Sequence, residues 1–403
     1  MKLNTNFSLL LLGQSLADIG DVLYTVSVIS TVFVLTGSVS VSSFVPFTIT
    51  ASMFISSLLT PILVGKVNLK WLLAGSQIGK TTLLIILGFM FNGLTKSNYY
   101  LIFILIGLIA LLDGCANPIR QTLIPHYVKH EFLIQANGIA ETVTQIIQSV
   151  MWFVGSIFLI FMSPQQLVWL VGGLFVIASV ILCLLENVKH KTTEPKRKLE
   201  QIKEGWITLS NTTVLRKIAL IDCFETIAGT VWIAAILYVF VSDALNVDEK
   251  WWGFINGSYF IGLIFGSIYC IKCSSFIEEK LGTFIFIGSL AISLATILFS
   301  LNRIPMIALL LSLVVGLFGQ IKNIPQQTII QTSVTKGKLA TLYTTSGAIV
   351  TGIFGISSLL MGILADLLGI RAVFIISGLL LALVSAIVHR NKYLFVTKVK
   401  QQE

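Results

Sequence analysis

Residues 7–36 read FSLLLLGQSLADIGDVLYTVSVISTVFVLT, an apolar run that carries two acidic residues, Asp18 and Asp21, near its middle. A helix needs roughly 20 apolar residues to cross about 30 Å of hydrocarbon, so this run is long enough to span a membrane. A carboxylate at bilayer depth costs about 3 kcal/mol on insertion scales, and it is usually retained for ion pairing, proton relay or substrate contact. The run therefore predicts a membrane helix with a functional acidic face.

A second apolar run, 215–241, carries Asp222 and Glu225 at the same spacing, 204 positions further on. The chain therefore has two related halves, each of which buries acidic side chains in a membrane helix. The first run lacks a basic region and a small-residue cleavage site, so we expect it to be a retained span and not a signal peptide.

The whole chain has the composition of a membrane protein. It is 55% hydrophobic and 11% charged, with a mean hydropathy of +0.92, whereas about a quarter of the residues in a soluble domain are charged. We predict an all-α integral membrane protein with twelve transmembrane helices in two pseudo-symmetric six-helix bundles. The predicted spans are 7–36, 41–64, 71–94, 99–118, 138–162, 166–185, 215–241, 252–271, 283–301, 304–321, 339–362 and 372–389.

The basic residues indicate the orientation of these spans. With both termini in the cytoplasm, only Lys96, Lys250, Arg303 and Arg371 fall on the outer side and Lys80 falls inside a span, while the other Lys and Arg residues lie on the inner side. This pattern predicts a multi-pass protein of the plasma (inner) membrane. The net charge of +9 suits an anionic inner leaflet, and no nucleic-acid partner is expected.

The domain organisation follows from the one long polar connection. We predict an N-terminal six-helix bundle over residues 1–185, a cytoplasmic central loop over 186–214 and a C-terminal six-helix bundle over 215–403. A second internal match supports the two halves. At an offset of 206 residues, five positions recur with identical residues: Asn117, Gln121, Thr122, Ile124 and Val128 match Asn323, Gln327, Thr328, Ile330 and Val334.

The stretch from Asn117 to Pro125, NPIRQTLIP, is followed by Gln135-Ala136-Asn137. Together they resemble the signature between the fourth and fifth spans of the macrolide-efflux and enterobactin-exporter branch of the major facilitator superfamily. The resemblance implies the major facilitator fold and a proton-coupled antiporter that works by alternating access. It also implies multidrug or macrolide-type efflux, and hence antibiotic resistance, by a protein that works as a monomer.

Three helices carry polar stripes at helical spacing, and each stripe lies on one helix face. Because lipid cannot solvate them, we expect the stripes to face a protein-lined cavity. We take Asp18, Asp21, Asp222 and Glu225, together with Lys80, as candidates for proton coupling or substrate binding. The candidates for lining the cavity are Gln14, Thr25, Gln145, Gln148, Trp152 and Trp232. The stripes are Gln14, Asp18, Asp21 and Thr25; Glu141, Gln145, Gln148 and Trp152; and Asp222, Glu225, Gly229 and Trp232.

Two readings of the acidic residues remain open at this point. Burial disfavours the charged form of a carboxyl group, so a buried carboxylate that binds and releases a proton would couple protons to movement. The alternative is a static charge pair, such as Asp18 or Asp21 with Lys80. Four acids against Lys80 alone would leave a negative interior that attracts organic cations, and Trp152 or Trp232 could add cation–π contacts.

Arg120 and Glu141 flank the inner loop between the fourth and fifth spans. We treat them as a hypothetical inner gate, in which Asp113 shares, although ordinary satisfaction of helix ends explains them equally well. Five cysteines show no paired framework, and the Cys270–Cys273 CxxC pair lacks further zinc ligands nearby. We therefore expect neither a metal nor another cofactor.

The sequence shows neither a phosphate-binding loop nor a nucleophile–base arrangement, so an enzyme is not expected. We expect a secondary transporter that exports a hydrophobic or amphipathic, cationic small molecule in exchange for protons. The alternatives are an importer or facilitator of a polar metabolite, a lipid or siderophore exporter on the same fold, and a membrane sensor.

Overall fold

A computed structural model describes residues 4–37, 39–64, 66–188, 198–232, 234–248 and 250–395. Across these residues the protein is helical and contains no β-strand. The longer helices are α1 Thr5–Thr36, α2 Val39–Val64, α3 Leu69–Met90, α4 Tyr100–Asp113, α5 Ala116–Tyr127, α6 Leu133–Phe161, α7 Pro164–Cys183, α8 Lys198–Asn211, α9 Thr213–Gly229, α11 Lys250–Lys272, α13 Leu281–Leu301, α14 Pro305–Ser333, α15 Lys336–Leu368 and α16 Ile370–Asn391. The short elements are η1 Phe91–Gly93, η2 His130–Phe132, η3 Thr230–Trp232, α10 Ala234–Val239, η4 Phe240–Ala244, α12 Ser274–Glu279 and η5 Lys392–Leu394.

The expected class of fold is confirmed. Ten helices of the described chain are long and apolar enough to cross a membrane, or eleven if one bent pair counts as a single span. That pair joins Thr213–Trp232 to Ile236–Ala244 with a bend of 47°. The count is close to the predicted twelve, and α6 lies where the remaining span, 138–162, was expected.

Most helix bounds lie within a few residues of the predicted spans, but the span predicted at 304–321 ends too early. In the structure α14 continues through Pro325 to Ser333. Lys322, assigned from the sequence to an inner loop, therefore lies inside the helix and is only 5% exposed. A lysine at this depth needs an anionic partner.

The described residues form two compact units. The first contains Met1–Lys129, Ile146–Ile207 and Lys336–Ala348, and the second contains His130–Gln145, Thr208–Thr335 and Ile349–Glu403. The first part of α6 thus groups with helices of the second sequence half, and the first part of α15 with helices of the first half. The predicted division at 186–214 remains a prediction; residues 189–197 of that loop lie outside the described chain.

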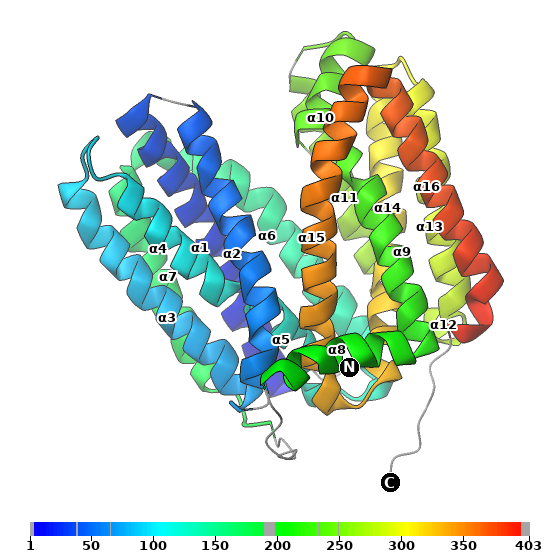
Figure 1. Cartoon of the computed structure of the whole chain (residues 1–403), viewed down its shortest axis with the longest axis horizontal. Helices are drawn as coiled ribbons and strands as arrows, with labels where there is room; N and C mark the ends of the chain where they lie inside the picture. Colours follow the sequence, from blue (N-terminus) through cyan, green and yellow to red (C-terminus); the bar gives the residue numbers. More distant parts are fainter. Residues whose placement is uncertain are drawn as a thin grey trace. The chain divides into compact units, whose positions relative to one another are not determined.

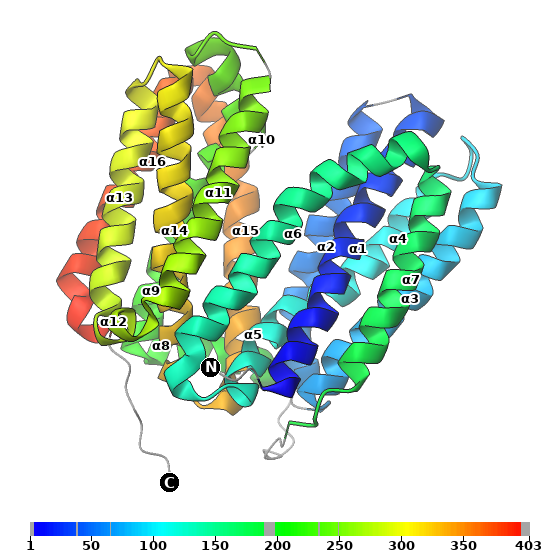
Figure 2. The same ribbon diagram turned by 180° about the vertical axis from the view of Figure 1, so that it is seen from behind.

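In the first unit α7 packs between α1 and α3, and α2 packs against α4 (Figures 1 and 2). The core of this unit is apolar and fully buried, and Phe175 of α7 lies within it. The ring of Phe175 and the side chain of Val171 occupy the space beside Gly20 of α1, where any larger residue would clash. Gly20 therefore permits the close packing of α1 against α7.

In the second unit α14 packs against α11 and α13, and α13 packs against α16 (Figure 1). The contact between α11 and α14 is unusually close. A Cβ atom on Gly262 would lie 2.1 Å from the carbonyl oxygen of Leu313, and one on Gly316 would lie 2.1 Å from that of Tyr259. Small residues permit such close helix packing in membranes, where apolar side chains alone provide little driving force.

Candidate functional site

A buried ion-pair cluster joins three helices of the first unit. Lys80 of α3 is only 1% exposed, and its Nζ lies 2.8 Å from Oδ2 of Asp21. The same ammonium also pairs with Asp113, at the end of α4. The ring of Phe175 lies 5.1 Å from this ammonium and closes one side of the cluster. Lys80 is therefore the counter-ion of two carboxylates.

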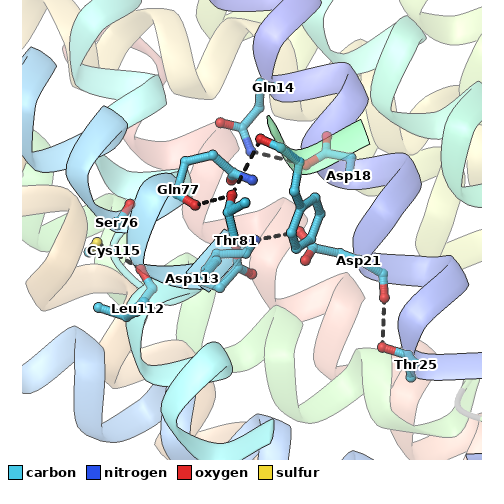
Figure 3. Close-up of polar contacts among 12 residues, drawn as sticks. Gln14, Asp18, Asp21, Thr25, Ser76, Gln77, Thr81, Leu112, Asp113 and Cys115 are labelled. Carbon is cyan, nitrogen blue, oxygen red and sulfur yellow. Dashed lines mark hydrogen bonds and ion pairs between the residues drawn. The ribbon is translucent and has the colours of Figure 1, made fainter. Parts of the chain in front are cut away.

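The cluster continues along α1 toward α5. Gln14 donates a hydrogen bond of 3.1 Å to Oδ1 of Asp18, and the guanidinium of Arg120 lies 3.6 Å from Oδ2 of the same carboxylate. Arg120 also donates to Asn117. Figure 3 shows Gln14, Asp18 and Asp21 along one side of α1, as their spacing predicts.

Several polar atoms of this cluster keep hydrogen-bonding capacity. Among the described residues, Oδ1 of Asp21, Oε1 of Gln14 and Nε2 of Gln77 are buried without a hydrogen-bond partner. Gln77 and Gln14 are both more than nine-tenths buried. Thr25, by contrast, donates to the backbone carbonyl of Asp21, one turn earlier in α1. This hydroxyl bonds within its own helix and does not extend the cluster.

A second acidic cluster lies in the other unit, between α9 and α14. Glu225 forms an ion pair with Lys322, which is the partner that the buried lysine requires. Gln326, one turn further along α14, donates a hydrogen bond of 2.5 Å to Oδ1 of Asp222. Asp222 therefore has an amide partner, whereas Glu225 has a cation.

The two clusters change the charge balance expected from the sequence. The first unit brings three carboxylates, Asp18, Asp21 and Asp113, together with Lys80 and Arg120. The second brings two carboxylates together with Lys322. Each cluster thus carries a formal charge of −1, which is less negative than the sequence alone suggests because two cations that were assigned to inner loops are buried.

A cavity of about 390 Å³ opens onto the second cluster. Its wall includes the charged side chains of Asp222, Glu225 and Lys322, together with Gly229, Trp232 and Tyr259. The last three residues also line a neighbouring cavity of about 310 Å³, whose wall includes Asn256, Phe260, Ser312 and Phe354. Each volume suits a small molecule.

Each of the predicted gate residues has a polar partner. Arg120 pairs with Asp18, as described above, while Glu141 accepts a weak hydrogen bond of 3.4 Å from Gln327. Asp113 lies with Lys80. A gate formed by Arg120, Glu141 and Asp113 therefore stays a prediction.

The first part of α6 is bound to α14 by amides. Asn137 and Gln331 exchange two hydrogen bonds, of 2.8 and 3.1 Å, and both side chains are buried. Gln145 and Gln148 lie further along α6 and are half-buried, while the side chain of Trp152 lies outside the described part of the chain. The motif residue Asn137 thus has a structural role that its position in the sequence did not reveal.

Near this contact, His130 lies 3.6 Å from Glu278 of α12. Burial raises the pKa of the Glu278 carboxyl above its usual value, and the neighbouring His130 opposes that rise. Among the described residues, no group of three His, Cys, Asp or Glu side chains is arranged to hold a metal ion.

Sequence reasoning missed two members of the second cluster, Lys322 and Gln326. One signal was available. The internal repeat continues past 321, from Asn323 to Val334, and residues 326–332 contain neither Gly nor Pro, which favours a longer helix. The repeat, read as a helix, would have placed Lys322 and Gln326 within the span, without indicating their partners.

Comparisons with known proteins agree with this architecture. The model of the Major Facilitator Superfamily matches residues 10–355. Two proteins of Bacillus subtilis (strain 168) are 29% identical to the chain: the uncharacterized MFS-type transporter YfmI, over 97% of both chains, and the uncharacterized MFS-type transporter YjbB, over 94% of this chain and 93% of its own.

Solved structures share the fold at low sequence identity. The human organic anion transporter MFSD10 (TETRAN) has a TM-score of 0.78 at 10% identity, covering 95% of this chain and 99% of its own. A bacterial homologue of the iron transporter ferroportin has a TM-score of 0.75 at 13% identity, covering 96% and 98%. The E. coli fucose:proton symporter FucP has a TM-score of 0.72 at 14% identity, covering 96% and 97%.

Proposed function

Because the chain belongs to the major facilitator superfamily, we propose that it exports a hydrophobic or amphipathic, cationic small molecule in exchange for protons, as a secondary active transporter. Such carriers move small molecules across membranes and are typically not enzymes. The macrolide-efflux and enterobactin-exporter branch, with its implied role in antibiotic resistance, is part of the proposal and rests on the NPIRQTLIP and QAN motifs.

The observation that supports the proposal most strongly is the buried cluster of Asp21, Lys80 and Asp113. A purely structural pair would be balanced, because leaving a charge uncompensated in a low-dielectric interior is costly. With Asp18 and Arg120 included, this cluster has one carboxylate in excess. A bound proton removes that excess, and the partnerless Oδ1 of Asp21 is where we place it.

The proposed cycle uses both clusters. In the inward-open state the ionised carboxylates attract the cationic substrate, and Asp222 and Glu225 are its candidate ligands in the second unit. Protons that enter from outside then neutralise the acidic face of α1 and favour release. The two sequence halves, 1–185 and 215–403, would move around the site, with 186–214 as the connection between them.

We also propose a location and an oligomeric state for the protein. The bias of Lys and Arg toward one side of the predicted spans supports a plasma-membrane location with both termini in the cytoplasm. We propose that the protein works as a monomer.

The direction of transport is tested in cells. Deletion of the gene should raise the accumulation of a fluorescent, lipophilic cationic dye severalfold, and expression of the protein from a plasmid should reverse the increase. Export would be contradicted if accumulation did not change and uptake of a polar nutrient were lost, which would identify the alternative importer. Unchanged fluxes of both compounds would indicate a sensor.

A further inference from the structure

The carboxylates that line the cavity of the second unit are only partly neutralised by the protein. Glu225 already has Lys322 as a cation, whereas Asp222 is held by the neutral amide of Gln326. A buried carboxylate without a counter-ion is costly, and a cation placed beside it removes that cost. The cavity therefore lacks one positive charge.

The surroundings of Asp222 support this charge count. Gln326 is 6% exposed, and its Oε1 has no hydrogen-bond partner among the described residues, so the amide that holds Asp222 keeps one acceptor. The other elements that line the cavity present Ile292 from α13, Val350 from α15 and Leu381 from α16, all of them apolar, while α11 presents the phenol of Tyr259. None of these side chains supplies the missing cation.

The neighbouring cavity has a different chemistry. Trp232 lines both cavities, and its ring also packs against Phe299 and Phe374. The walls around it include the aromatic rings of Tyr259, Phe260 and Phe354. Aromatic faces favour a delocalised or lipophilic cation.

We propose that the cavity of the second cluster binds a lipophilic organic monocation, with Asp222 as the partner of its charge, the aromatic rings of Trp232 and Tyr259 in its walls, and Lys322 as a permanent internal cation that excludes a second positive charge. The inference rests on the proposed function in taking the bound cation to be the transported compound. Binding itself requires neither a membrane nor a gradient.

Calorimetric titration of the purified full-length protein in detergent tests the charge count, with empty micelles as the blank. The probes share one scaffold: tetraphenylphosphonium as the monocation, triphenylphosphine oxide as the neutral compound, and an alkyl-linked bis(triphenylphosphonium) as the dication. The wild-type protein should bind the monocation at least tenfold more tightly than either of the others. Asp222→Asn should abolish the preference for the monocation over the neutral compound.

Lys322→Met is expected to increase the affinity for the dication, a result that a misfolded variant would not give. Without the internal cation, Glu225 is uncompensated as well, so the dication should bind at least tenfold more tightly than it binds the wild type. Lys280→Met removes a lysine from outside the cavity and should leave all three affinities as they are. Equal binding of the three probes by the wild type, or no gain of dication affinity in Lys322→Met, would overturn the proposal.

Normal binding of the monocation by the wild type without transport in vesicles would contradict the proposed function alone.

Discussion

Replacement of Lys80 by Met is expected to prevent the protein from folding stably. The lysine is 1% exposed and pairs with both Asp21 and Asp113, so its loss leaves two carboxylates facing each other without a cation. Removing one partner of a buried ion pair costs roughly 3–5 kcal/mol, a large part of the stability of most proteins. The yield of monodisperse protein in detergent and its thermal midpoint should both fall sharply.

A second substitution distinguishes lost charge balance from lost packing. Adding Asp113→Asn to Lys80→Met removes one of the two orphaned carboxylates, so most of the lost stability should return, as a coupling energy between the two sites. Lys338→Met, at an exposed lysine, is the control and should melt like the wild type. If Lys80→Met were as stable as this control, Lys80 would not be a counter-ion.

The second large effect is expected for Asp21→Asn. The amide has nearly the shape of the carboxylate and leaves the pair between Lys80 and Asp113 in place, but it cannot bind and release a proton. Accumulation of substrate driven by a pH gradient in proteoliposomes should therefore fall at least tenfold. Exchange of labelled for unlabelled substrate without a gradient should continue, because it requires no net proton movement.

Asp243→Asn is the matched control for this experiment, because Asp243 is exposed in η4 and belongs to neither cluster. It should transport like the wild type. Full accumulation by Asp21→Asn would exclude Asp21 as the proton carrier. Loss of exchange together with accumulation would indicate a damaged site and not a loss of coupling, and it would count equally against the assignment.

Much of the fold could be predicted from the sequence because membrane helices are decided by local composition. An apolar run of sufficient length must be helical in lipid, where each backbone polar group needs an internal partner. The bounds of α1 and α13 therefore differ from the predicted spans by two residues or fewer. The same rule gave the wrong end for α14, because a lysine and several amides were read as the start of a loop.

The candidate site was harder to predict because the cations that pair with the acidic residues come from helices that do not correspond between the two units. The acidic pair of α1 is neutralised by Lys80 of α3 and Arg120 of α5, whereas the repeated pair of α9 uses Lys322 of α14. The internal repeat therefore predicts the acids but not their cations. Pairings of this kind depend on which helices pack together, and the spacing of residues along one helix carries no such information.

The central claim, that protons drive the movement of a cation in the opposite direction, is tested most directly with purified protein in liposomes. The membrane potential is clamped at zero with valinomycin and equal potassium, and labelled tetraphenylphosphonium is added outside. When the lumen is made acidic, protons leave and the cation should accumulate inside above its equilibrium level; nigericin should abolish this accumulation. Accumulation that is the same with and without the pH gradient, or that occurs only with an alkaline lumen, would contradict the account.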